Sequence, residues 1–204
     1  MKRIVVAMFG VLIVMLCIMP VMAREDSGTA PMAGGGQSVD IDTQTPVLDG
    51  GAFSQYDTVF FHGAMAEANP SSIGVNSEGD YSDCHRITLN PSGGIAYINC
   101  PYVSYDSKKG GIYPMVRYCG FQYRTSGAAE IYRVGVWNGP TWVNTIVFDP
   151  PLKNTTSDYT LQVIDLGGWY TFNRGLNMCV WIRNPSTTLN GQVDLGGYGA
   201  RYEW

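Results

Sequence analysis

Short β-rich runs dominate the sequence from residue 53 onward, and no window in that region shows a convincing helical period. Each run is bounded by Gly, Pro, Asn or Asp, the residues that favour turns. The expected strands cover residues 56–61, 84–89, 95–100, 115–124, 131–137, 142–148, 159–164, 176–183 and 193–202. About nine short strands at this spacing predict an all-β fold, a jelly-roll-like antiparallel β-sandwich over residues 53–204.

The first 23 residues have the pattern of a secretory signal peptide. Lys2 and Arg3 precede an apolar run that ends at Met19, and the expected cleavage site follows Ala23. An uncleaved membrane anchor is the alternative, but the apolar run of about 16 residues is shorter than the roughly 20 that span a bilayer. We therefore expect a secreted, extracellular protein that meets a membrane only through an uncleaved signal segment.

Residues 24–52 are expected to form a flexible acidic linker between the signal peptide and the sandwich. This stretch contains five acids and one base, a Gly34-Gly35-Gly36 run, two prolines and no hydrophobic periodicity. The formal net charge of the whole chain is −4, which argues against a nucleic-acid binder because such proteins usually carry a basic excess.

Four cysteines remain after residue 23: Cys84, Cys100, Cys119 and Cys179. An even number in an exported chain predicts two disulfides that staple the sandwich. Cys84 and Cys100 flank the turn cluster at residues 90–94 symmetrically, so a hairpin would bring their Cβ atoms close enough for a bridge. This register predicts Cys84–Cys100 and, by elimination, Cys119–Cys179. Four reduced and buried cysteines are the alternative.

Several short segments resemble a family of small uncharacterised prokaryotic β-sandwich proteins. They are Phe61-His62-Gly63 with Glu67 and Pro70, the runs 121–125 and 128–134, and the closing segments 174–176 and 199–202. The resemblance implies a jelly-roll-like sandwich and implies no activity. The chain departs from the family pattern at Phe60 and Phe61, where the family has an aromatic pair led by Trp, and in its four cysteines.

Catalytic motifs are missing from the sequence. His62 and His85 are the only histidines, neither has a metal-ligand partner at i+2 or i+4, and no nucleotide-binding or hydrolase motif occurs. We expect His62 to be a hydrogen-bonded turn residue. A glycosidase would need two facing carboxylates, and Glu130, Asp149, Asp165 and Asp194 at expected strand ends are the candidates. No cofactor is predicted.

The run of residues 76–83 contains alternating oxygen ligands around Gly79, and calcium prefers such oxygens. The spacing does not fit an EF-hand, so a plain polar loop is the expected structure and no metal site is assigned. Asn154-Thr155-Thr156 is the only glycosylation sequon. It follows two prolines in an expected loop, where we expect it to be accessible.

Aromatic residues in the second half of the chain are the best candidates for ligand binding. Trp137 and Trp142 flank a turn, and Trp169 and Tyr170 follow Gly167-Gly168 in an expected loop. Exposed Trp and Tyr rings can stack on the apolar faces of sugars, whereas core packing is the alternative use of large aromatic residues.

Two functional hypotheses follow from these features. The first is a secreted, non-enzymatic sandwich that binds a glycan or a cell-surface protein or contributes to extracellular matrix. Self-association is a variant of it, in which residues 39–43 add a strand to a neighbouring subunit. The second hypothesis is a small secreted hydrolase that uses carboxylates in the manner of a glycosidase.

Overall fold

The computed structural model describes residues 55–103, 107 and 111–204. The expected signal peptide and acidic linker lie outside the described residues. Within the described part of the chain, no helix has the length and apolar character needed to cross a membrane.

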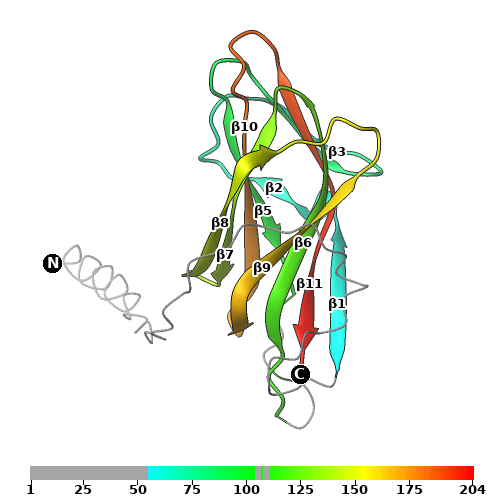
Figure 1. Cartoon of the computed structure of the whole chain (residues 1–204), viewed down its shortest axis with the longest axis vertical. Helices are drawn as coiled ribbons and strands as arrows, with labels where there is room; N and C mark the ends of the chain where they lie inside the picture. Colours follow the sequence, from blue (N-terminus) through cyan, green and yellow to red (C-terminus); the bar gives the residue numbers. More distant parts are fainter. Residues whose placement is uncertain (1–54, 104–106, 108–110) are drawn as a thin grey trace, which may run out of the picture.

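The described residues form eleven strands in two antiparallel sheets that face each other (Figure 1). The strands are β1 (Tyr56–His62), β2 (Glu67–Ala68), β3 (Val75–Asp80), β4 (His85–Leu89), β5 (Ile95–Pro101), β6 (Met115–Gly127), β7 (Glu130–Asn138), β8 (Thr141–Leu152), β9 (Thr160–Thr171), β10 (Leu176–Arg183) and β11 (Gly191–Glu203); a 3-10 helix, η1 (Gly63–Met65), follows β1. The expected all-β sandwich is confirmed, and the two strands that the sequence did not indicate are β2 and β3.

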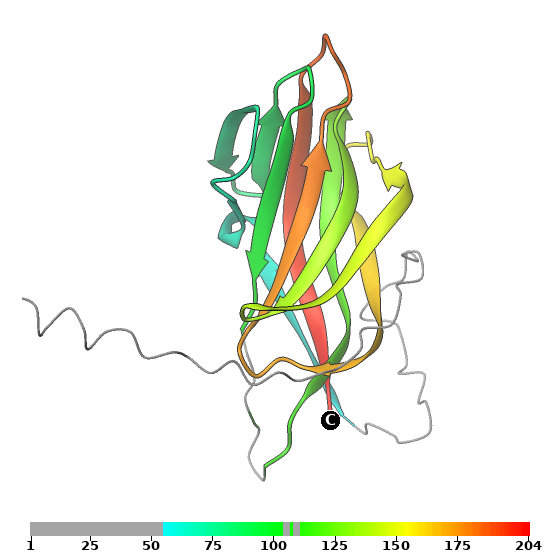
Figure 2. The same ribbon diagram turned by 90° about the vertical axis from the view of Figure 1, so that its left-hand side faces the viewer.

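Nested pairing of the strands generates the two sheets. The pair β7–β8 is innermost, and β6–β9, β5–β10 and β4–β11 follow outward along the chain. Successive pairs alternate between the sheets, which gives the orders β2-β5-β10-β7-β8 and β3-β4-β11-β6-β9, with β1 paired to the second half of β11. This nesting is the arrangement of a jelly roll. Figure 2 shows the five-stranded sheet in front of the six-stranded sheet.

Period-two alternation places one apolar face of each sheet in a shared core. In β10, Leu176, Met178, Val180 and Ile182 are almost fully buried and belong to the core. Tyr198 is also buried there, and its ring packs edge-on against Tyr102 at a centroid distance of 5.1 Å. The opposite face of each strand is therefore free to present polar and aromatic side chains.

The expected hairpin across residues 84–100 is wrong, although both of its strands exist. β4 pairs with β3 and β11 in the six-stranded sheet, whereas β5 pairs with β2 and β10 in the five-stranded sheet. Residues 90–94 therefore connect one sheet to the other.

The predicted disulfides are absent, because Cys84, Cys100, Cys119 and Cys179 are all free thiols. Cys84 lies in the six-stranded sheet region beside the Tyr159 hydroxyl, whereas Cys100 lies in the core on β5. Cys119 is also in the core, whereas Cys179 lies on the outer face of β10, opposite Asn99 of β5. Each predicted pair thus joins a cysteine in the core to a cysteine on the outer face of a sheet. The structure instead has four reduced, buried cysteines, which was the alternative expectation.

Candidate functional site

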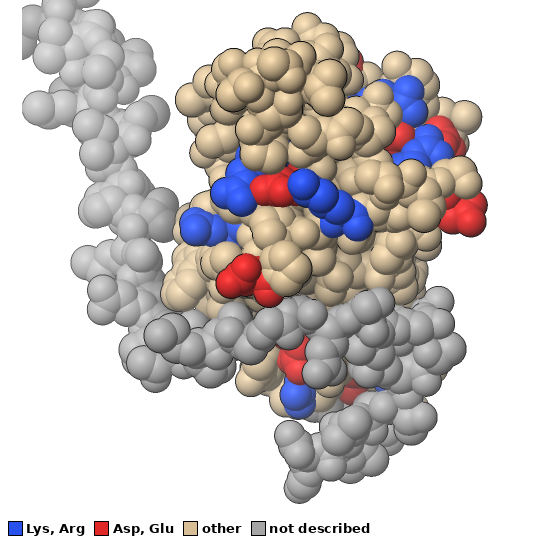
Figure 3. Space-filling model, turned by 45° about the horizontal axis from the view of Figure 1, so that its top comes forward, with Lys and Arg blue, Asp and Glu red and all other residues tan. Residues whose placement is uncertain are grey.

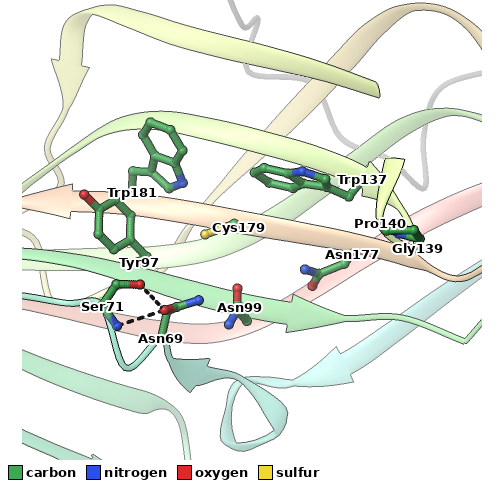
Figure 4. Close-up of a pocket in the computed structure, with 10 residues that line it drawn as sticks. All are labelled: Asn69, Ser71, Tyr97, Asn99, Trp137, Gly139, Pro140, Asn177, Cys179 and Trp181. Atoms are coloured by element: carbon green, nitrogen blue, oxygen red, sulfur yellow. Dashed lines mark hydrogen bonds between the residues drawn. The ribbon is translucent and has the colours of Figure 1, made fainter. Parts of the chain in front are cut away.

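The outer face of the five-stranded sheet carries a groove with a volume of about 570 Å³. Ten residues line it: Asn69, Ser71, Tyr97, Asn99, Trp137, Gly139, Pro140, Asn177, Cys179 and Trp181 (Figure 4). They come from the loop after β2, from β5, β7 and β10, and from the β7–β8 turn. No Asp, Glu, Lys, Arg or His is among these ten residues.

Strand alternation explains why these side chains face outward. In β10, Asn177, Cys179 and Trp181 alternate with the apolar residues that enter the core. In β5, Tyr97 and Asn99 alternate in the same way with buried Ala96, Ile98 and Cys100. The outer face of two adjacent strands therefore supplies half of the groove.

Strand register sorts the outward residues into three rows. Trp181 lies opposite Tyr97, Cys179 lies opposite both Asn99 and Gly135, and Asn177 lies opposite Trp137. Successive rows are about 7 Å apart, because outward residues are two positions apart along each strand. The small residues of the middle row leave a hollow between the two aromatic rows.

Gly135 makes room for the indole of Trp137 over the middle row. A Cβ atom at residue 135 would lie 2.4 Å from the Cη2 atom of Trp137, well inside van der Waals contact. The ring therefore lies back over its own strand. Because residue 135 has no side chain, the Trp137 indole can occupy this position and form one wall of the groove.

Trp181 is fixed on two sides at the other end of the groove. Its ring meets Tyr97 edge to face, with centroids 5.5 Å apart and an interplanar angle of 86°. The Arg133 guanidinium carbon lies 4.6 Å from the Trp181 ring centroid, within the range of a cation–π contact. These contacts fix the Trp181 ring before a ligand binds, so little side-chain entropy of Trp181 would be lost on binding.

Three asparagine amides provide the polar groups of the groove. The Oδ1 atom of Asn69 accepts hydrogen bonds from the backbone N–H and hydroxyl of Ser71, as drawn in Figure 4. The Oδ1 atom of Asn177 is buried and has no hydrogen-bond partner among the described residues. A buried carbonyl oxygen without a donor is costly, so this atom can accept a hydrogen bond from a ligand or from water.

Cys179 forms the floor between the aromatic rows. Burial raises the pKa of the Cys179 thiol to about 11, so the sulfur is protonated at neutral pH. A neutral thiol is a poor nucleophile, and the side chain acts here as a small apolar surface.

The four sequence-predicted binding residues divide between the two sheets. Trp137 lines the groove, and Trp142 lies opposite it on β8 with 51% of its surface exposed. Trp169 and Tyr170 lie in strand β9 of the other sheet, so the expected loop is wrong. Trp169 packs edge-on against Tyr118, and Tyr170 packs against the core.

Sequence reasoning missed Trp181, Tyr97 and the three asparagines. Alternation within residues 176–183 already puts Asn177, Cys179 and Trp181 on the face opposite to four aliphatic residues. That pattern marks an outward face with an aromatic residue on it. It does not say which strands lie alongside, and the groove depends on those neighbours.

The acidic run at residues 76–83 is mostly strand β3 and not a loop. The Glu78 Oε1 atom accepts a hydrogen bond from the Ala68 backbone N–H and lies 3.0 Å from His85 Nε2. The Asp80 Oδ1 atom lies 2.7 Å from His85 Nδ1. These carboxylates face protein groups, and the described residues contain no cluster of three or more His, Cys, Asp or Glu suited to a metal ion.

Three of the four candidate acids, Glu130, Asp165 and Asp194, pair with basic side chains, whereas Asp149 is exposed on β8, and none of the four lines the groove. Asp194 lies 2.8 Å from both Arg86 and Arg124, and Glu130 lies 2.6 Å from Arg183. Although burial opposes it, hydrogen bonds from Arg86 and Arg124 hold the pKa of Asp194 below its ordinary value. Figure 3 shows blue and red atoms in small mixed groups on a surface that is otherwise neither acidic nor basic.

His62 is a hydrogen-bonded turn residue, as expected. Its Nδ1 atom accepts a hydrogen bond from the Ala64 backbone N–H at 3.1 Å, which caps η1. Its Nε2 atom lies 3.1 Å from the Ser82 carbonyl oxygen. Both ring nitrogens are therefore used in joining β1 to the segment before β4.

Asn154 is less accessible than the sequence suggested, with 8% of its surface exposed. Its Nδ2 donates hydrogen bonds to the carbonyl oxygens of Tyr123 and Asp158, and its Oδ1 accepts from Thr156. The amide that would carry a glycan thus organises the loop, and glycosylation there remains a prediction.

Comparison with known proteins gives only distant structural likeness. No protein-family model matches the chain, and no curated protein matches its sequence. One similar solved structure is TmCBM61 in complex with beta-1,4-galactotriose, with 12% identity, a TM-score of 0.37, and coverage of 73% of this chain and 90% of that chain. Another is from infectious bursal disease virus Gt strain, with 14% identity and a TM-score of 0.36. This match covers 90% of this chain and 39% of the viral chain. At these values the likeness does not extend to function.

Proposed function

We propose that this protein is a non-enzymatic binding protein that takes a neutral glycan into the groove on the five-stranded sheet. The observation that carries the proposal is the combination of aromatic walls, three asparagine amides and an uncharged lining in one groove. Sugars offer apolar ring faces for stacking and hydroxyls for hydrogen bonds to amides. The ten lining residues carry no charge, which favours a neutral sugar over an acidic one, and the Arg133 guanidinium at one end of the groove is stacked on Trp181.

The groove chemistry also supports binding over hydrolysis. Glycoside hydrolysis by the common mechanism needs two carboxyl groups on either side of the scissile bond. The ten lining residues include no acid, and Asp165, Asp194 and Glu130 are held by arginines elsewhere. The hydrolase alternative has no comparable observation in its favour.

Action outside the cell is part of the proposal and rests on the sequence of residues 1–23. A binding protein for glycans at the cell surface or in a matrix needs export, which that segment would provide. Recovery of a chain that begins at Arg24 from outside the cell would support this part, and an intact N-terminus in the membrane fraction would contradict it.

The binding proposal is tested by electrophoresis of the purified protein in gels that contain polysaccharides. Neutral galactan, glucomannan, xyloglucan and dextran form one set, and polygalacturonate and alginate form the acidic set. We expect at least one neutral polymer to retard the protein. Trp181→Ala should weaken that retardation about tenfold or more, because it removes the aromatic wall opposite Trp137.

Trp169→Ala is the matched control, because it removes an indole from the other sheet. We expect it to leave retardation unchanged, and melting temperatures would show that both variants are folded. Retardation only by acidic polymers, or by none of the six, would show that the proposed function is wrong. Equal weakening by the two variants would show that the groove is not the site.

A further inference from the structure

We propose that the ligand is a chain of several sugar units that lies across the strands, from Tyr97 on β5 to Trp142 on β8. This inference rests on the proposed function and extends its site beyond the groove. Trp142 does not line the groove, yet it lies directly opposite Trp137 in the β7–β8 pairing. Directly opposed residues project from the same face of a sheet, so the two indoles share the outer surface.

A β-bulge places Trp142 on that outer face. Val136 pairs with Asn144 and Trp137 pairs with Trp142, which leaves Val143 as an extra residue on β8. Val143 is buried against the core, and the Asn144 side chain reaches inward to donate to the Leu166 carbonyl oxygen of the other sheet. If β8 alternated regularly through Val143, Trp142 would lie on the same side as Asn144 and Ile146.

Both indoles lean in the same direction along the sheet. The Trp142 Nε1–H donates a hydrogen bond to the Thr145 hydroxyl at 2.9 Å, and Thr145 lies opposite Gly135. Trp137 lies over that same Gly135. The two rings therefore form a platform that continues the groove to β8, and the ring of Trp142 is held by its own hydrogen bond.

Exposure shows that this platform is available to a ligand. Trp142 is 51% exposed, and Val147, further along the same edge strand, is 53% exposed. A cross-strand Trp–Trp pair can also serve only to stabilise a hairpin. Hairpin stabilisation alone would not require the hydrogen bond that fixes the Trp142 Nε1 atom. It would also not require this indole to lie beside a groove that already contains Trp137.

The length of the platform indicates the size of the ligand. β5, β10, β7 and β8 are consecutive neighbours, so Tyr97 and Trp142 are about 14 Å apart across the strands, and the two row intervals between them add about 14 Å along the strands. A single sugar ring is much shorter than either distance. A chain that crosses the strands would contact Tyr97, pass over Cys179 and Asn177, stack on Trp137 and end over Trp142.

Isothermal titration with oligosaccharides of one to six units tests this arrangement, using the repeat unit of the neutral polymer that retards the protein. We expect affinity to rise with chain length and then level off once the chain reaches Trp142. The last gain should be about tenfold, the contribution of one stacked aromatic ring. Trp142→Ala should abolish that last gain and leave affinity for the shortest bound oligosaccharide unchanged.

Two further variants make the result specific. Trp142→Phe keeps an aromatic face and should keep most of the gain, whereas Phe60→Ala removes a comparably exposed ring, 42% exposed, from β1 of the other sheet and should change nothing. Affinity that does not depend on length, or an equal loss for short and long chains in Trp142→Ala, would overturn the inference while leaving groove binding intact. A failure of every oligosaccharide and polymer to bind would instead overturn the proposed function.

Discussion

At the scale of single residues, Gly135 determines the shape of the groove without contributing a side chain. A methyl group there would collide with the far end of the Trp137 ring, which can swing away because it is a side chain and not backbone. We expect Gly135→Ala to keep the fold, with a melting temperature near or slightly above that of the wild type, because Gly is unfavourable within strands. Affinity for the neutral glycan should fall about tenfold as the indole is displaced.

The measurement combines titration with the indole N–H signals in a nitrogen–proton correlation spectrum. The chain has five tryptophans, so five such signals are expected. Only the Trp137 signal, identified by its loss in Trp137→Phe, should move strongly in Gly135→Ala. An unmoved Trp137 signal with unchanged affinity would mean that the glycine has no part in positioning the ring.

At the scale of elements, strand register around the bulge in β8 determines which face Trp142 occupies. Deletion of Val143 would place Trp142 directly before inward-facing Asn144, so regular alternation should keep Trp142 on the outer face opposite Trp137. We expect glycan affinity to be kept, whereas the lost burial of Val143 should destabilise the protein by roughly 2–4 kcal/mol. Urea unfolding measures the stability change.

Val143→Ala is the control for the deletion, because it shortens the same side chain and keeps the residue count. It should lower stability through lost burial while the Trp142 signal stays at its native position. Glycan affinity that is lost in the deletion but kept in Val143→Ala would show that Trp142 has left the outer face and that strand register does not place it there.

Strands were predictable from local sequence, whereas their partners were not. The run of residues 176–183 alternates so regularly that its bounds match β10. The segments around residues 90–94 also read correctly as two strands and a turn. A hairpin and a crossover between sheets have the same local sequence, however, and the choice depends on β10 and β11, which lie about 80 to 100 residues further on.

The candidate site was half predictable for the same reason. Trp137 and Trp142 were indicated because they flank a two-residue turn and thus belong to a local hairpin. Trp181 and Tyr97 come together only through the register of β10 with β5. The disulfide prediction was wrong because it required the same long-range information: a pairing inferred from the false hairpin left Cys119 and Cys179 as partners by elimination.

At the scale of the whole molecule, the buried thiols and phenols make the fold sensitive to alkali. Burial raises the pKa of Cys119 from 9.0 to about 12. It also raises the pKa values of Cys100, Tyr102 and Tyr198 above their ordinary ranges. Because the folded state holds these protons more tightly than the unfolded chain, their contribution to stability is complete below pH 9 and is lost as the pH rises.

Cys119 alone should lower the free energy of unfolding by about 4 kcal/mol between pH 9 and pH 12. Urea unfolding at a series of pH values measures this slope. Cys119→Ala would be less stable at neutral pH through lost packing, but its stability should fall less steeply between pH 9 and pH 12. Parallel slopes for the two proteins would show that the thiol is not the group responsible.

Nested pairing also sets the order in which contacts can form as the chain folds. β7 and β8 are joined by two residues, whereas the segment between Leu89 and Gly191, which pair when β4 meets β11, contains roughly a hundred. Closing a short loop takes less time and loses less entropy than closing a long one. The hairpin that carries Trp137 and Trp142 is therefore the first pairing within reach of the folding chain. The strands that bring Tyr97 and Trp181 beside this hairpin pair more slowly, because their pairing closes longer loops. The ability to bind should therefore be among the last properties to emerge during folding.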